Sequence, residues 1–537
     1  MALALGLAAA AFLAGCSDDT DLFSESLGGV FGSRADFGGI VVADEPRAAV
    51  AARDVLQAGG NAADAAVTLY FTLAVTLPSS ASLGGGGMCL IHDPQAKKVE
   101  ALDFMPRAAA EGGLAVPASA RAMGALHARF GRLPWAQLLG GPEQMARLGV
   151  PTSRALAREL ATAGEGLLRD EAMRSIFAPH GHLLEEGEPL QQIELASVLA
   201  QLRQRGAADL NTGHLATTFV DAVRAMGGSI DVASMRDTTP RFVAPVRLPV
   251  GNHVLDAAPP PAAGGALALE LIAMLTGPRH YADASDAEKP HLLVEAMKRA
   301  FADRARWMRP DGSSSEPAEA IVAPEHAAAL MQDYSPDQAT PISALPAAPV
   351  GGPENPWATG FVVADREGRA VACNVTLNQL FGTGRMVPGM GIVVAPAPGD
   401  QGAGAIDLGP MLLVNEHTGA FYYGAAASGG TTAPTAMAQV FLRSVIGKQP
   451  LSAAIAAKRL HHNGEPDIVF VEPGESPEVL DALHRLGHRT EEAQIIGRVA
   501  AVWCSGGMQA KTETCQAMSD PRADGLALLL LNDESGS

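Results

Sequence analysis

A run of four glycines and a pair of neighbouring histidines are the first places where the residue types suggest chemistry. The glycines (84–87) stand in SSASLGGGGMCLIHD, where a helix ends, a loop follows and a strand begins. Dinucleotide-binding loops have the opposite order, because glycines that cradle phosphate open a helix. We therefore interpret this loop as a place where buried helices pack closely against strands.

The histidines are His461 and His462. Adjacent residues do not share a helical face, and no third ligand stands nearby in the sequence. We predict a structural role for both. No Cys or His spacing resembles a zinc site, so we expect no metal and no cofactor.

Four cysteines lie in the body of the chain. Cys504 and Cys515 flank a glycine-rich turn, and an oxidising compartment would allow them to pair; the sequence leaves this open. Cys89 and Cys373 stand in apolar, strand-like runs. We predict that these two are unpaired thiols in the core.

The fifth cysteine, Cys16, ends an apolar run whose last residues, LAGC, resemble a bacterial lipobox. In that motif the cysteine sulfur carries diacylglycerol. Residues 1–16 are thus expected to be a lipoprotein-type signal segment and 17–37 a tether, with an ordinary secretory signal as the alternative. Ser17 favours a periplasmic protein anchored to the outer membrane of a Gram-negative bacterium. No later apolar run is long enough to span a bilayer.

Composition excludes several classes of partner. The 537 residues include 39 Lys and Arg against 58 Asp and Glu, a formal charge of −19. Nucleic-acid binding and polybasic membrane binding both need clustered cations, so neither is expected. With 47% apolar and 18% charged residues, the chain is typical of a globular protein that binds small molecules or proteins.

The elements that must position any site follow from the hydrophobic pattern. Asn61 is a good N-cap for a helix that is apolar nearly all round and must be buried. A long helix at 291–308 is followed by a proline-dense connector at 331–357. Beyond it come short strands, including a hairpin with the loop Asn415–Gly419. This order indicates stacked sheets covered by helices.

Nine blocks of sequence resemble the γ-glutamyltransferase (glutathione hydrolase) family, in the family's order. They are GGNAADAAV (59–67), PSSASLGGGGM (78–88), LPWAQL (133–138), APPPAAGG (258–265), EAMKRAFADRAR (295–306), TLNQLFGTG (376–384), SGG (428–430), KRLHH (458–462) and SDPR (519–522). The resemblance implies an α+β fold, the four-layer αββα sandwich of the N-terminal-nucleophile hydrolases.

The resemblance also implies a chemistry. Family members cut themselves into a large and a small subunit, here the regions 38–357 and 358–537. The cut exposes a threonine whose hydroxyl attacks the γ-glutamyl amide and whose own amine acts as base. However, the register places Ala358 at the nucleophile. Thr359 is next, but one residue along a strand turns a side chain to the opposite face.

Other family positions have also changed. The substrate-clamping arginine falls on Met105-Pro106, with Arg107 two residues further on. The paired serines fall on Ile406-Asp407, and the glutamine falls on Ala397. An arginine clamp works by bidentate bonds to carboxylate, which methionine and proline cannot make.

The remaining matches are partial. Thr376 and Asn378 match residues that support the nucleophile and bind substrate, and Asp400 matches the carboxylate that pairs with the α-ammonium group. Gly429 and Gly430 match the backbone N–H pair of the oxyanion hole. Asn378 could equally brace the glycine loop that follows, and the two glycines could simply form a tight turn.

We therefore expect a family member that is catalytically degenerate and binds a small γ-glutamyl or amino-acid-like ligand. The alternative is an active, diverged amidohydrolase that uses Thr359 after a shifted self-cleavage. The sequence does not identify protein partners.

Overall fold

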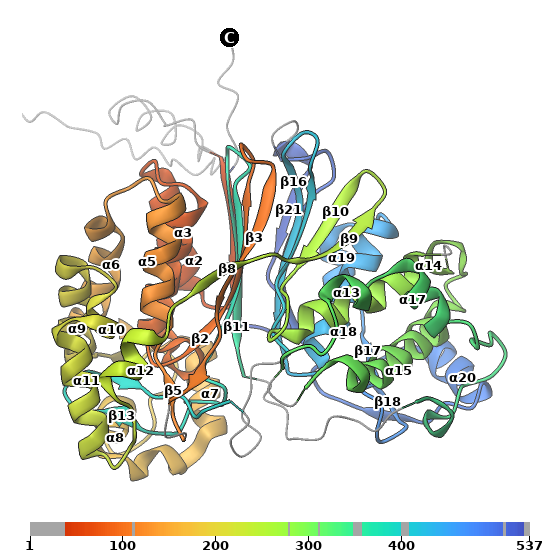
Figure 1. Cartoon of the computed structure of the whole chain (residues 1–537). Helices are drawn as coiled ribbons and strands as arrows, with labels where there is room; N and C mark the ends of the chain where they lie inside the picture. The colour runs from red at the N-terminus through yellow and green to blue at the C-terminus, as the bar shows by residue number, and fades with distance from the viewer. Residues whose placement is uncertain are drawn as a thin grey trace, which may run out of the picture. The chain divides into compact units, whose positions relative to one another are not determined.

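Two antiparallel β-sheets lie face to face between two layers of helices (Figure 1). The computed structural model describes residues 38–109, 113–277, 280–309, 312–346, 357–398, 407–508 and 512–530. The expected α+β four-layer sandwich is confirmed. Cys16, the tether and Asp400 lie outside the described residues.

The first sheet has seven strands. Their order is β22 (Leu526–Leu530), β1 (Gly39–Ala43), β11 (Thr359–Asp365), β12 (Ala370–Thr376), β2 (Gly86–Asp93), β3 (Lys98–Phe104) and β8 (Arg241–Val243). The two central strands, β11 and β12, come directly after the proline-dense connector.

The second sheet has six strands. Their order is β21 (Cys515–Met518), β20 (Arg498–Cys504), β16 (Ala420–Ser428), β15 (Met411–Asn415), β10 (His253–Ala257) and β9 (Val246–Val250). The β15–β16 hairpin turns at 416–419, as the sequence predicts. The short strands outside the two main sheets are β4 (Arg107–Ala108), β5 (Ala115–Val116), β6 (Val150–Pro151), β7 (Pro189–Leu190), β13 (Met386–Val387), β14 (Ile392–Val393), β17 (Leu460–His461), β18 (Val469–Val471) and β19 (Thr490–Glu492).

One helical layer covers the first sheet (Figure 1). It contains α2 (Pro46–Gln57), α3 (Ala62–Thr76), α4 (Pro78–Ala81), α5 (Ser119–Phe130), α6 (Trp135–Leu148), α7 (Arg154–Ala163), α8 (Glu171–Phe177), α9 (Ile193–Arg205), α10 (Asp209–Thr212), α11 (His214–Ala225) and α12 (Val232–Asp237). Every residue of α3 is buried, and Asn61 caps it in a reciprocal capping box with Asp64. Both predictions for this helix are confirmed.

The other helical layer covers the second sheet. It contains α13 (Ala263–Thr276), α14 (His280–Asp283), α15 (Lys289–Trp307), α16 (Ala318–Ile321), α17 (Pro324–Leu330), α18 (Thr432–Phe441), α19 (Leu451–Ala456) and α20 (Pro477–Arg485). In the described part of the connector, up to residue 346, the regular element is a short 3₁₀ helix at Ile342–Ala344. Among the described residues, no helix is both long enough and apolar enough to cross a bilayer.

Alternation along the strands divides the apolar core into layers. On β11, Phe361 and Val363 pack toward α3 and its neighbours, whereas Val362 and Ala364 pack into the core between the two sheets. Successive side chains of a strand point to opposite faces, so the strand serves both cores. The same alternation determines which face of the sheet the residues at the start of β11 point to.

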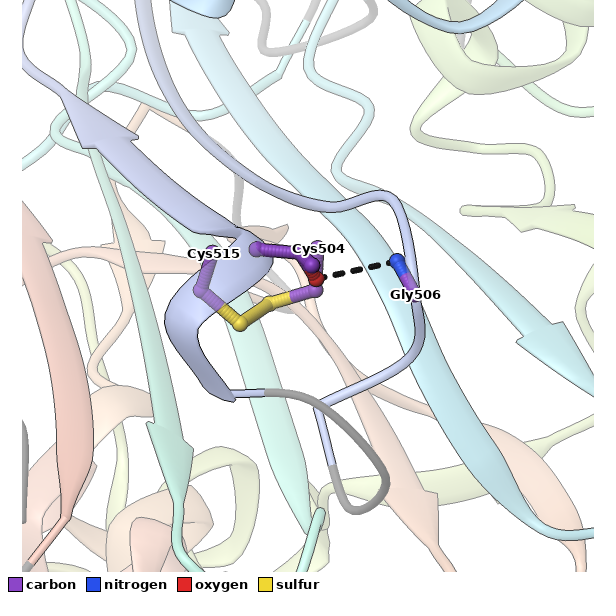
Figure 2. Close-up of a disulfide and its surroundings, with 4 residues drawn as sticks. Cys504, Gly506 and Cys515 are labelled. Atoms are coloured by element: carbon purple, nitrogen blue, oxygen red, sulfur yellow. Dashed lines mark hydrogen bonds between the residues drawn. A yellow bond between two sulfur atoms is a disulfide. The ribbon is translucent and has the colours of Figure 1, made fainter.

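All four cysteines of the sheets form disulfides, Cys89–Cys373 and Cys504–Cys515. The prediction of unpaired core thiols at Cys89 and Cys373 is therefore wrong. The two cysteines face each other on neighbouring strands β2 and β12, with Cα atoms 4.1 Å apart. The second pair, shown in Figure 2, joins β20 to β21 in the same way.

The glycine loop packs against three strands. A Cβ atom on Gly84 would overlap the carbonyl oxygen of Val393, and one on Gly86 would overlap that of Phe104. One on Gly87 would overlap the carbonyl oxygen of Asn374. The loop is thus a site of close backbone approach, as the sequence predicts.

Replacing Gly84 by alanine should lower the free energy of unfolding by more than about 3 kcal/mol, because the backbone of β14 would have to move. The matched control is Gly140→Ala in α6, where a Cβ meets no atom within 4 Å. That change should stabilise the protein by about 0.5–1 kcal/mol. Urea or thermal unfolding of both variants checks this, and equal stabilities would contradict it.

Candidate functional site

A small pocket lies where β11 begins and where β12 and β16 end, close to the N-terminus of α18. It is lined by Trp357, Ala358, Thr376, Asp407, Leu408, Ala427, Ser428, Gly429, Gly430 and Ala433. Its water-accessible volume is about 10 Å³, which is room for about one water molecule. Five of the residues that the sequence analysis named meet here: Ala358, Thr376, Asp407, Gly429 and Gly430.

The pocket is lined by Ala358, the residue just before β11, and not by Thr359, the first residue of the strand. Ala358 faces the same side of the sheet as Val362, because four residues separate them, and it packs against the core between the sheets. Thr359 is buried on the other face, where its hydroxyl donates to Asp44 Oδ2 at 3.2 Å. The Gly360 N–H donates to the same oxygen at 3.0 Å. The hydroxyl is therefore held away from the pocket.

Thr376 holds the carbonyl that precedes Ala358. Its hydroxyl donates to the Trp357 carbonyl oxygen at 3.0 Å and accepts from the Asn378 N–H at 3.0 Å. The Asn378 side-chain amide donates to the Pro396 carbonyl at 3.0 Å, and the backbone of Asn378 has φ 64°. Asn378 thus braces the loop after β12 and does not line the pocket.

Gly429 and Gly430 connect β16 to α18. Their φ angles are 136° and 61°, which glycine adopts with little strain. Thr432 closes the turn, because its hydroxyl donates to the Gly429 carbonyl at 2.7 Å. Both glycines line the pocket, so the turn and the oxyanion-hole interpretations are compatible at this position.

Asp407 contributes the pocket's carboxyl group, and its partner is Arg304 of α15 at 3.3 Å. Burial raises the pKa of Asp407, and the Arg304 guanidinium opposes that shift. Arg304 is buried as well. It lies inside the EAMKRAFADRAR block, but nothing in its sequence position indicated that it reaches the pocket.

Arg107, the arginine two residues beyond the family's clamp position, does not line this pocket. Its guanidinium donates to Asp103 at 2.7 Å and to the Thr239 carbonyl at 3.3 Å. Arg241 donates to the same Asp103 carboxylate at 3.0 Å. Met105, at the family's arginine position, is buried in the core between the sheets.

Sequence reasoning missed two buried carboxyl groups: Asp44, which contacts the Thr359 hydroxyl, and Glu159, whose pKa the charge of Asp44 influences. Burial raises the pKa of Asp44 to about 6, opposed by the Gly360 N–H and by Arg498. Burial likewise raises the pKa of Glu159 to about 7, opposed first by a hydrogen bond from Ser79. Arg498 influences both groups and lies over the Trp357 ring, 5.9 Å from its centre.

His461 and His462 have separate partners. His461 Nδ1 bonds the Thr435 hydroxyl at 2.9 Å, and His462 Nε2 bonds Asp467 at 3.1 Å. Burial lowers the pKa of His461 to about 3 and that of His462 to about 4. Both rings are therefore neutral at physiological pH.

A larger cavity, of about 770 Å³, opens beside the start of α7. Its charged side chains are engaged with other protein groups: Arg154 pairs with Glu186 at 3.0 Å and Asp524 with Arg158 at 2.7 Å. The smaller pocket is the better candidate because it is lined by the residues that carry the family resemblance.

Comparison with known proteins finds relatives along most of the chain. The family model described as gamma-glutamyltranspeptidase matches residues 48–112, 110–400 and 407–530. The chain is 27% identical to the glutathione hydrolase proenzyme of Bacillus subtilis, over 91% of each chain. It is also 27% identical to that of Pseudomonas aeruginosa, over 93% of this chain and 96% of the relative.

Solved structures resemble the fold. A cephalosporin acylase from Bacillus halodurans superposes with a TM-score of 0.78 at 24% identity, covering 93% of this chain and 98% of the acylase. A gamma-glutamyltranspeptidase chain from Pseudomonas nitroreducens superposes with a TM-score of 0.51 at 26% identity, covering 56% and 95%. The first likeness concerns the fold alone.

The buried Asp44 should make stability depend on pH. Its pKa is raised from 3.8 to about 6 on folding, so its contribution to stability is full below pH 4 and is lost as the pH rises through 6. Between pH 4 and 7 the wild type should lose up to about 3 kcal/mol relative to Asp44→Asn. Urea unfolding of both proteins at several pH values checks this; parallel pH profiles would contradict it.

Proposed function

This chain belongs to the gamma-glutamyltranspeptidase family, and on that premise we propose that it is an exported, catalytically silent member that remains uncut and binds a small amino-acid-like ligand. The curated relatives are named glutathione hydrolases, so γ-glutamyl compounds are the first ligand class to consider. The observation that carries the proposal is the methyl group of Ala358 at the pocket, where the family's chemistry needs a hydroxyl.

The groups around Ala358 support the proposal that self-cleavage has been lost although the carbonyl that it would attack is still held by its neighbours. In the family's self-cleavage, the side-chain hydroxyl attacks the carbonyl before it, here that of Trp357. Thr376 donates to that carbonyl oxygen and would polarise it. The electrophile is thus held in place, whereas the nucleophile is absent from residue 358 and the Thr359 hydroxyl is bound to Asp44.

The Asp407–Arg304 ion pair supports an amino-acid-like ligand. An α-ammonium group is a partner for Asp407, and an α-carboxylate is a partner for Arg304. A zwitterionic ligand could therefore replace the Asp407–Arg304 ion pair with two ion pairs between ligand and protein, one at each of these residues. Because the pocket has room for about one water molecule, binding requires Asp407 and its neighbours to move apart.

One observation favours the alternative, in which Thr359 is the nucleophile. Its hydroxyl donates to Asp44, whose carboxylate could accept the proton as the oxygen attacks the Ala358 carbonyl. Such a cut would place the new N-terminus at Thr359, on the side of the first helical layer. The position of any cut therefore distinguishes the two hypotheses.

We expect the purified full-length protein, with no added protease, to migrate as one chain on a reducing denaturing gel. Intact mass spectrometry should find no fragment that begins at Ala358 or Thr359. Hydrolysis of a γ-glutamyl anilide should be at least roughly 10³-fold slower than by the Bacillus subtilis relative assayed in parallel. A fragment beginning at Thr359, absent in Thr359→Ala, would instead establish the alternative.

The matched gain-of-function variant is Ala358→Thr, which places a hydroxyl beside the carbonyl that Thr376 holds. We expect partial cleavage between residues 357 and 358. Ala358→Val has nearly the same shape without the hydroxyl and should remain whole. If Ala358→Thr stays uncut while folded, the missing hydroxyl is not what keeps the chain intact.

Export and lipid anchoring through Cys16 form the second part of the proposal. The two disulfides support it, because such bonds persist in oxidising compartments. In a Gram-negative host, the wild type should fractionate with the outer membrane and incorporate labelled fatty acid. Cys16→Ser should lose the label and the membrane association, and an unlabelled wild type would contradict the lipid anchor.

A further inference from the structure

Three helices of the layer over the second sheet bring two carboxyl groups and one imidazole together. Glu270 comes from α13, Asp303 from α15 and His326 from α17. Their nearest ligand atoms all lie within 4.8 Å of one another. The cluster lies outside the pocket described above.

Glu270 is the unusual member. Its side chain is 0% exposed, and among the described residues neither carboxyl oxygen accepts a hydrogen bond of good geometry. Burial raises its pKa far above the ordinary value, and the nearby charge of Asp303 adds to that shift. A buried carboxyl whose oxygens accept no hydrogen bond of good geometry is costly, so a group that binds both oxygens is the expected compensation.

The spacing of the donor atoms fits a bound ion. His326 Nε2 lies 2.9 Å from Asp303 Oδ2 and 3.5 Å from Glu270 Oε1. Ligand atoms about 2.0–2.2 Å from a metal stand about 3.0 Å apart at right angles and about 3.5 Å apart at the tetrahedral angle. The two distances in the structure match these spacings, and the shorter one is also that of the hydrogen bond between His326 and Asp303 that forms without an ion.

We propose that Glu270, Asp303 and His326 hold a divalent transition cation of the Zn²⁺ or Mn²⁺ type. One imidazole nitrogen with two carboxylate oxygens suits these ions, whereas an all-oxygen set would suit Mg²⁺ or Ca²⁺. The cation neutralises both carboxylates, so Glu270 is bound in its ionised form. Three protein ligands leave further positions for water.

Arg306 is the group that competes with the cation. It donates to both oxygens of Asp303, at 2.9 and 3.0 Å, and also pairs with Glu316 at 3.1 Å. Its side chain is partly exposed, so it can leave Asp303 Oδ2 and keep Glu316 when the ion binds. In the absence of an ion, the Arg306 guanidinium therefore balances the negative charge of the Asp303 carboxylate.

The site has a structural role rather than a catalytic one. The ion joins α13, α15 and α17 at one point, and Arg304, the residue after Asp303, reaches Asp407 at the pocket. Binding therefore fixes the part of α15 whose Arg304 pairs with Asp407, a residue that lines the pocket. Because the ion binds the folded state, it should stabilise the protein.

The test uses the full-length chain without a histidine tag, stripped with EDTA and then titrated calorimetrically with Zn²⁺, Mn²⁺ or Mg²⁺. We expect about one Zn²⁺ or Mn²⁺ per chain by elemental analysis, a melting temperature raised by a few degrees, and much weaker Mg²⁺ binding. Glu270→Gln should weaken binding at least about tenfold. The control Glu325→Gln, exposed and next to His326, should bind like the wild type.

If Glu270→Gln fails to fold, His326→Ala replaces it, since that side chain is partly exposed and its loss leaves the core intact. Unchanged affinity in either variant would overturn the proposal. So would a wild type that retains no ion while Glu270→Gln is more stable, the result expected if a proton shared with Asp303 occupies the site. Mg²⁺ binding as tight as that of Zn²⁺ would overturn the class of ion.

Discussion

The constraint on which the pocket depends is the burial of β11 on both faces. The strand pairs with β1 on one side and β12 on the other, and all seven of its residues are buried. Each buried aliphatic side chain contributes roughly 1.5–3 kcal/mol, and a slip of one residue would send every one of them into the wrong core. Ala358 and Thr359 cannot exchange places without that loss. The chemistry of the pocket therefore depends on which side chain stands at one position.

Buried carboxyl groups recur around this strand and the helices behind the second sheet, and each is compensated differently. Asp44 accepts from a hydroxyl and a backbone N–H, Asp407 pairs with Arg304, and Glu159 accepts from Ser79. Neither oxygen of Glu270 accepts a hydrogen bond of good geometry from the described residues, and His326 Nε2 lies 3.5 Å from one of them. The same cost of burial thus leads to a hydrogen bond, an ion pair or a candidate ion site, according to what the neighbouring elements offer.

Local signals in the sequence were sufficient for several elements and for stacked sheets covered by helices, whereas the four-layer αββα sandwich was implied by the family resemblance. The cap at Asn61, the hairpin after Asn415 and the glycine loop each depend on residues a few positions apart, and the structure confirms them. Contacts between distant segments were not predictable in this way. Asp44 meets Thr359 from 315 residues away, and the Glu270 cluster joins three helices without a motif. Such contacts depend on strand register and helix packing, which spacing alone does not encode.

The disulfide between Cys89 and Cys373 is also a contact between distant segments, because the pairing of β2 with β12 brings the two sulfurs together. This disulfide joins the segment before the peptide bond between residues 357 and 358 to the segment after it. A break in the backbone there would leave two pieces that are still one covalent molecule until a reductant opens the bridge. A proteolytic cut at this boundary, by whatever enzyme, would therefore not release either half of the protein outside a reducing environment.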